Sequence, residues 1–212
     1  MGIVTADISV TLDGYGAGPN QRREAPFGDL DEEPLHRWML EHADENAAEV
    51  AAITAADAYI MGRTMFSPGR GEWDVAWKGW WGEDPPYHAP VFVLTHHERE
   101  PLPMEGGTTF NFVTDGIASA LDHARAAAGS GNVAIAGGAM TINQYLAAGL
   151  IDELRLHLVP FAAGVSSGSR IFDGIPPIDF DVVSARHTQH VTHLTYRRGE
   201  RAGRAAGQSR TR

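Results

Sequence analysis

The stretch VAIAGGAMTINQYLAAGLIDELRLHLVP, residues 133–160, decides the fold of this chain. Its first four residues form a short apolar run, which leads directly into Gly137-Gly138 and then into a helical segment that begins at Ala139. Its last third alternates leucine with other residues, as a half-buried strand does. A strand, a helix and a second strand in this order are typical of an α/β fold. The glycine pair either makes a tight turn or lets another group lie against a backbone without Cβ atoms.

The rest of the chain also alternates between strands and helices. Helices are predicted where apolar residues recur every three or four positions, and strands where they alternate or form short buried runs. The result is one α/β domain with a mostly parallel central sheet and antiparallel C-terminal strands. The predicted strands lie within residues 3–16, 58–62, 91–96, 109–115, 133–136, 150–161, 177–190 and 191–198, and the other predicted helices within residues 29–56 (with a second segment at 45–55), 63–66 and 116–128.

Composition excludes several classes of protein. The 212 residues are 43% hydrophobic and 21% charged, which is ordinary for a globular domain, and no apolar run is long enough to cross a membrane. The absence of cysteine excludes disulfides and thiolate chemistry and fits a reducing cytoplasm. The net charge of −10 argues against nucleic acid as the main partner. An Arg-rich end predicts a domain of residues 1–198 followed by a disordered tail of residues 199–212.

Two junctions share one design, because Gly62-Arg63-Thr64 and Gly137-Gly138 each join a strand to a helix. The N-terminus of a helix carries unpaired N–H groups and a partial positive charge, so anions bind there, and glycine permits a close approach. Thr141 adds a hydroxyl group to the second junction, and Arg63 adds a charge suited to phosphate. Glycine between a strand and a helix can also serve only to turn the chain. Two such junctions favour a dinucleotide site, although neither is a Rossmann or P-loop motif.

These motifs resemble the dihydrofolate reductase-like family. The branch that they resemble is the reductase domain of the bifunctional riboflavin-biosynthesis deaminase-reductase, over about residues 3–198. The resemblance implies a three-layer sandwich around the central sheet. The motifs occur in the order VTLDG (residues 10–14), AYIMGRTMF (58–66), VFVLTH (91–96), VAIAGGAMTI (133–142) and SRIF (169–172).

The resemblance implies NADPH as the cofactor, bound across the carboxyl ends of the central strands. Arg63 would lie near the adenosine, whose 2′-phosphate or adenine would reach the end of the strand at residues 91–96. In relatives the peptide bond between the residues matching Gly137 and Gly138 is cis, which is rare outside proline. The implied cofactor contacts are Leu12, Gly14, Gly62, Arg63, Thr64, Met65, Thr95, His96, Gly137, Gly138, Ala139, Met140 and Thr141.

The substrate end of the site rests on fewer residues. The resemblance places Asp13 beside the nicotinamide and the substrate, where it would orient the substrate or handle a proton. An Asp before Gly14 is also a common turn residue. Asp31, near the start of the first helix, and Trp38, on its apolar stripe, are the candidate substrate contacts. An acidic residue in a first helical turn can also serve only to offset the helix dipole.

The resemblance therefore implies an NADPH-dependent reductase without a metal. It would transfer hydride to a pteridine-, pyrimidine- or flavin-like small molecule, in the manner of dihydrofolate reductase or of the pyrimidine reductase of riboflavin biosynthesis. A second hypothesis is a nucleotide-binding module that keeps the cofactor groove without turnover. A Rossmann dehydrogenase is disfavoured, because the strand that ends in Gly62-Arg63 lacks an acidic residue for the ribose.

Two features have more than one interpretation. The Trp-rich loop (residues 67–90) holds four of the five Trp residues and would be a stacking lid over a planar ring, a self-packed loop or a dimer contact. His187, His190 and His193 lie on closing strands that are expected to be exposed, which favours solvated or hydrogen-bonded imidazoles over a metal site. The resemblance and the apolar closing strands also allow a homodimer.

Overall fold

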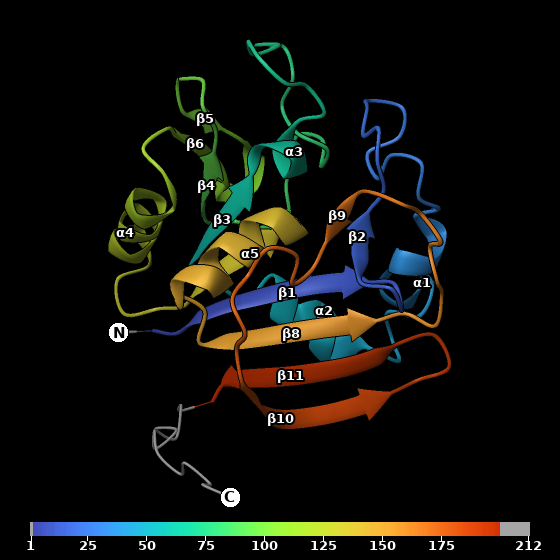
Figure 1. The fold of residues 1–212 in the computed structure, drawn as a ribbon. Coiled ribbons are helices and arrows are strands. Elements are labelled where there is room, and N and C mark those ends of the chain that lie inside the picture. Colours follow the sequence, from blue (N-terminus) through green and yellow to red (C-terminus); the bar gives the residue numbers. More distant parts are fainter. Residues whose placement is uncertain (1, 200–212) are drawn as a thin grey trace, which may run out of the picture.

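The structure is a computed structural model that describes residues 2–199 (Figure 1). The predicted tail lies outside the described residues from position 200 onward. Within the described part, no helix is both long enough and apolar enough to cross a bilayer. The strands are β1 (Val4–Val10), β2 (Tyr15–Ala17), β3 (Ala58–Gly62), β4 (Pro90–Leu94), β5 (Leu102–Pro103), β6 (Thr109–Val113), β7 (Val133–Gly137), β8 (Glu153–Leu158), β9 (Ser169–Arg170), β10 (Phe180–His187) and β11 (Thr192–Arg198), and the helices are α1 (Glu33–Leu40), α2 (Ala47–Ile53), α3 (Arg63–Phe66), α4 (Ile117–Ala128) and α5 (Ala139–Ala148), with a 3-10 turn at Glu105–Gly107.

Nine of the described strands form one mixed sheet in the order β10-β11-β8-β1-β7-β3-β4-β6-β5. The six strands from β8 to β6 run parallel to one another. The strands β10 and β11 at one edge, and β5 at the other, are antiparallel. The predicted α/β fold with a mostly parallel sheet and antiparallel C-terminal strands is therefore confirmed.

Helices cover both faces of the sheet and give three layers (Figure 1). Because successive residues of a strand point to opposite faces, Ile60 of β3 faces α4 and α5, whereas Tyr59 and Met61 face the other way. On that second face, α1 and α2 lie behind β1 and β8, and the Trp-rich loop packs over β3 and β4. The predicted helical region of residues 29–56 divides into α1 and α2 at Asn46, whose buried side-chain amide donates to the carbonyls of Trp38 and His42 at 3.0 and 2.8 Å.

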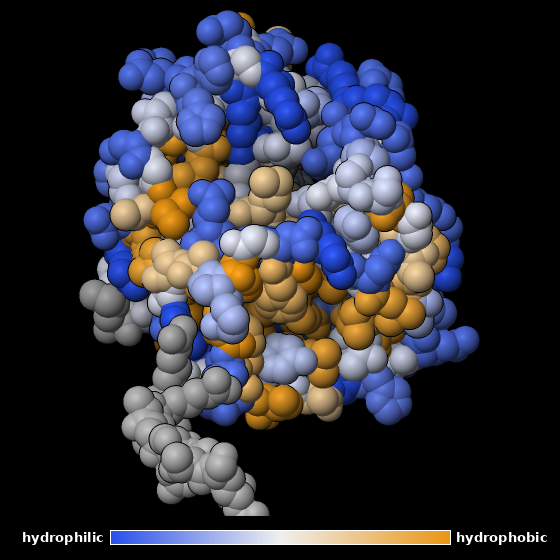
Figure 2. Space-filling view, in the orientation of Figure 1, coloured by the Kyte–Doolittle hydropathy of each residue, from blue (hydrophilic) through white to orange (hydrophobic). Residues whose placement is uncertain are grey.

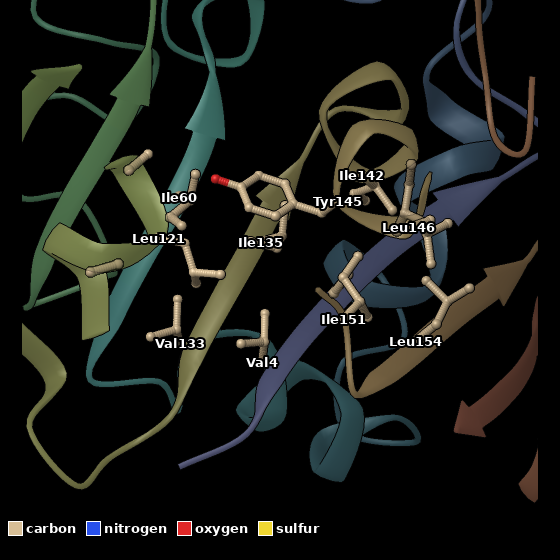
Figure 3. Close-up of a cluster of buried hydrophobic side chains, with 14 of the residues drawn as sticks. Val4, Ile60, Leu121, Val133, Ile135, Ile142, Tyr145, Leu146, Ile151 and Leu154 are labelled. Atoms are coloured by element: carbon tan, nitrogen blue, oxygen red, sulfur yellow. The ribbon is translucent and has the colours of Figure 1, made fainter. Parts of the chain in front are cut away.

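The main core fixes the position of α5. Tyr145 is fully buried against Ile135 of β7 and Leu121 of α4 (Figure 3), and its hydroxyl donates to the carbonyl of Ile117 at 2.8 Å. Burying a side chain of this size stabilises a fold by about 2–3 kcal/mol, and its polar atom is satisfied. The start of α5 is therefore held at the carboxyl end of β7 by packing along the helix.

Candidate cofactor groove

The two glycine junctions lie side by side, because β3 and β7 are neighbouring parallel strands. Gly62 ends β3 and Gly137 ends β7, and a helix follows each. A methyl group at Gly62 would overlap with Oγ1 of Thr141 on α5. Glycine at position 62 is therefore what lets β3 approach α5 this closely, and Thr141, which is 7% exposed, fills the space between the junctions.

Gly138 differs from Gly62 because the space in front of it is open. A methyl group there would meet no atom within 4 Å, and its φ of −80° suits any residue. Gly137 has a φ of +123°, which favours glycine, and the bond between the two glycines is cis. The N–H groups of Ala139 and Met140 have no acceptor within α5, because the first turn of a helix lacks preceding carbonyls. In the space-filling view, the surface above α5 is hollowed between the loops that follow β2 and α3 (Figure 2).

Arg63 supplies the positive charge at the first junction. Its Cζ lies 3.9 Å from the ring centroid of Trp73, and its Nε and Nη2 donate to the carbonyls of Gly69 and Glu72 at 3.1 and 3.3 Å. Burial lowers the pKa of Arg63, because the side chain is partly removed from water. α3 has only four residues, so this junction depends on the side-chain charge more than on a helix dipole. Thr64 is exposed, and Met65 lies beside Gly137.

The Trp-rich loop packs on the sheet. Trp81 stacks on Phe110 with ring centroids 5.9 Å apart, and Trp77 Nε1 donates to the carbonyl of Phe66 at 2.7 Å. Trp73 donates through Nε1 to the carbonyl of His97 at 2.8 Å. Of the predicted interpretations, the packing supports a loop that is packed on its own domain. The contact of Trp73 with Arg63 was not predicted from the sequence, where nothing links the first residue of α3 to a residue ten positions later on an irregular loop.

Thr95 and His96 follow β4, and the structure separates their roles. Thr95 is 7% exposed, and its hydroxyl donates to the carbonyl of His97 and accepts from the N–H of the same residue. The hydroxyl is therefore engaged in a local turn. His96 is exposed and lies next to this turn, at the same edge of the sheet as Gly62 and Gly137.

Asp13 is tied to the chain on the other side of the groove. Its carboxylate accepts from Thr11 Oγ1 at 2.6 Å and from the N–H groups of Ala163 and Gly164 at 2.9 and 3.0 Å. The hydrogen bond from Thr11 is the main cause that lowers the pKa of Asp13 to about 2. An ionised carboxylate with three local donors fits a clamp on the loop at residues 161–164 better than a proton donor. Its neighbours in the chain, Leu12 and Gly14, are exposed and partly exposed.

The two candidate substrate residues lie in different surroundings. Asp31 is exposed, and its Oδ1 accepts from the N–H of Glu33 at 3.2 Å, as a residue at the start of a helix does. Trp38 is 0% exposed, and its Nε1 donates to Ser9 Oγ at 3.0 Å. The expectation that Trp38 contacts a substrate needs correction, because α1 lies directly on β1 and the apolar stripe that identified this residue faces the core.

The prediction that the histidines of the closing strands are exposed is wrong for one of them. His193 was expected to be exposed, but it is 5% exposed and lies opposite the buried His157 of β8, with 2.8 Å between their Nδ1 atoms. Its Nε2 donates to Oδ1 of Asn46 at 2.9 Å. Burial, followed by the nearby His157, lowers the pKa of His193 to about 4. Alternation along β11 predicts that His193 and Leu194 point to opposite faces of the sheet. It could not show that α1 and α2 cover the face on which His193 lies.

A cavity of about 340 Å³ lies beside this histidine pair, between α2 and the strands β1, β8, β10 and β11. Asp7, Arg155 and His157 form its sheet side, and Glu49 lies on α2. It shares no residue with the predicted cofactor contacts, so the two places on the molecule are separate.

Comparisons with known proteins agree with this geometry. The RibD C-terminal domain family matches residues 3–195. A Shewanella sp. PV-4 protein named for riboflavin biosynthesis has a similar structure, with 23% identity and a TM-score of 0.63 over 93% of this chain and 99% of that chain. No curated protein matches the chain in sequence.

Two further structures extend the comparison. Acinetobacter baumannii RibD is 15% identical with a TM-score of 0.59, and 94% of this chain covers 59% of that longer chain. Dihydrofolate reductase from Enterococcus faecalis, complexed with NADP(H) and RAB-propyl, is 16% identical with a TM-score of 0.56 over 93% of this chain and 97% of that chain. The chain has the dihydrofolate reductase-like fold and belongs to the RibD C-terminal domain family.

Proposed function

We propose that this protein is an NADPH-dependent reductase that transfers hydride to a pteridine-, pyrimidine- or flavin-like small molecule. The observation that carries the proposal is the open backbone at Gly138, beside the N–H groups of the first turn of α5, which have no acceptor within that helix, and one strand away from the cationic Arg63. An elongated ligand with several phosphates fits this arrangement, since each phosphate needs donors or positive charge. Membership of the RibD C-terminal domain family supports the same reading.

Each part of the groove has a role in this proposal. Residues 137–141 would hold the pyrophosphate, and Arg63, Thr64 and His96 would hold the phosphate on the adenosine. Leu12 and Gly14 would lie along the nicotinamide. NADPH would supply the hydride, and the protein would align the heterocycle with it and exclude water. Asp13 would position the loop at residues 161–164, because its carboxylate is ionised and already has three donors.

The proposal predicts that Gly138→Val abolishes NADPH binding without unfolding the protein. The added side chain would enter open space in the folded protein, but it would occupy the place of the pyrophosphate. Calorimetric titration with NADPH and the melting temperature measure the two effects. Gly138→Ala is the graded control and is expected to weaken binding less. Unchanged NADPH affinity in Gly138→Val would contradict the proposed groove.

A nucleotide-binding module without turnover is the second candidate function. The hydrogen bonds of Asp13 favour it, because the carboxylate predicted at the substrate end already accepts from Thr11, Ala163 and Gly164 and holds a loop in place. Loss of the absorbance of NADPH with dihydrofolate or a pyrimidinone would decide for the reductase. Tight NADPH binding without oxidation across a set of such heterocycles would decide for the module.

A further inference from the structure

We propose that Trp73 is a positioning residue that fixes Arg63 and thereby sets a preference for the phosphorylated nicotinamide cofactor. This inference rests on the proposed function, in which Arg63 contacts the phosphate of NADPH. It assigns a role to the Trp-rich loop that neither a lid nor simple packing describes.

Three contacts hold the guanidinium group of Arg63 in one place. Its Cζ lies over the Trp73 ring, 3.9 Å from the ring centroid. Its Nε and Nη2 donate to the carbonyls of Gly69 and Glu72, which lie on the same loop as Trp73. These contacts leave Nη1 without a protein acceptor within residues 2–199. A long side chain that is already fixed loses less conformational entropy when it binds a ligand.

Trp73 is itself fixed between two strands of the sheet. Its Nε1 donates to the carbonyl of His97 in the turn after β4, and its ring forms an edge-type contact with the ring of Phe112 on β6, with 5.0 Å between centroids. Arg63 follows the neighbouring strand β3. The indole ring therefore connects the ends of β3 and β4, which are the two places where the adenosine phosphate is expected.

The charge around the ring favours an anion. Arg99 also lies near Trp73, with 5.3 Å from Cζ to the ring centroid, and donates through Nη2 to the carbonyls of Val75 and Trp77. Among the ion pairs formed within residues 2–199, none includes Arg63 or Arg99. Glu72 and Asp74 act on Arg63 and Arg99 through their charge at longer range, but the groups that the two guanidinium groups contact directly are neutral carbonyls. Two partly buried cations held in this way attract a phosphate more strongly than a hydroxyl group.

The test compares the affinities for NADPH and NADH, which differ by this phosphate. Trp73→Leu removes the ring face and is expected to weaken NADPH about 5- to 30-fold, the range of a partly desolvated cation–π contact, with NADH unchanged. Trp73→Phe keeps an aromatic face and is expected to restore most of the preference. Trp81→Leu is the matched control. Trp81 belongs to the same loop as Trp73, but it packs on Phe110 and Tyr87 and not on Arg63.

The possible results separate this inference from the proposed function. Equal weakening of NADPH and NADH in Trp73→Leu, or an unchanged ratio there while Arg63→Ala loses the preference, would overturn the role of Trp73 and leave the cofactor groove intact. Failure of the unmodified protein to bind NADPH would overturn both. If Trp73→Leu does not fold, the NADPH-to-NADH ratio of Trp73→Phe, compared with that of Trp81→Phe, gives the answer. In the Arg63→Ala background, Trp73→Leu is expected to have no further effect on the ratio.

Discussion

At the scale of single residues, two charged side chains of the groove are held in opposite ways. Asp13 has a low pKa because it accepts hydrogen bonds from a hydroxyl and two backbone N–H groups. Within residues 2–199, Arg63 donates to two neutral carbonyls and forms no ion pair, although Glu72 acts on it through its charge at longer range, so the guanidinium remains available to a ligand. A dinucleotide would therefore be oriented with its phosphates toward Arg63 and away from the carboxylate of Asp13, which would repel them.

His193 predicts how stability depends on pH. Its pKa is about 4 in the folded protein, compared with about 6.5 in an unfolded chain, so between these values the unfolded state binds more protons. The contribution of His193 to the stability of the folded protein is therefore fully present above pH 6.5 and is lost as the pH falls toward 4. The free energy of unfolding, measured with urea at several pH values, should decrease as the pH is lowered from 6.5 to 4. His193→Gln should have a flatter profile, and an identical slope in the variant would contradict this assignment.

At the scale of secondary structure elements, the parallel strands and the two junctions were predictable from the sequence. Alternation in β8 and short apolar runs in β3 and β7 depend on local residue order, and the glycine pair marks the turn into α5. The buried His157–His193 pair and the contact between Trp73 and Arg63 were not predictable. Both join elements that are distant in the chain or irregular, and hydrophobic periodicity carries no information about which element covers a polar strand face.

The contact between β3 and α5 predicts a specific compensation. Gly62→Ala should lower the free energy of unfolding by about 1–3 kcal/mol, because the new methyl group overlaps with Thr141 Oγ1. Thr141→Ala removes that oxygen, so the double variant should regain most of the stability lost in Gly62→Ala. Urea denaturation of the two single variants and the double variant measures the coupling. Strictly additive effects would show that the two side chains do not meet.

At the scale of the whole molecule, the groove and the polar cavity share no residue, although β1 borders both. The groove lies at the carboxyl ends of β3, β4 and β7, where parallel strands present their following loops to a ligand. The cavity lies under α2, on β1, β8 and the closing antiparallel strands. Events in one are therefore expected to affect the other only through global stability.

Cofactor binding in the proposed groove predicts an effect on thermal stability. A ligand that binds only the folded state stabilises it by about 2.7 kcal/mol at one hundred times its dissociation constant. NADPH should therefore raise the melting temperature of the unmodified protein. Arg63→Ala should reduce the rise with NADPH and leave the rise with NADH unchanged, because only the phosphate contact is lost. A similar reduction with both cofactors would contradict the phosphate role of Arg63.

The distribution of the indole rings has an optical consequence. Trp38 of α1 is fully buried against β1, whereas the other four Trp residues lie in the loop that follows α3. The intrinsic fluorescence of the protein therefore combines one emitter that reports on the integrity of the fold with four that report on the loop. Replacing Trp38 by Phe would leave a chain whose emission follows the loop alone.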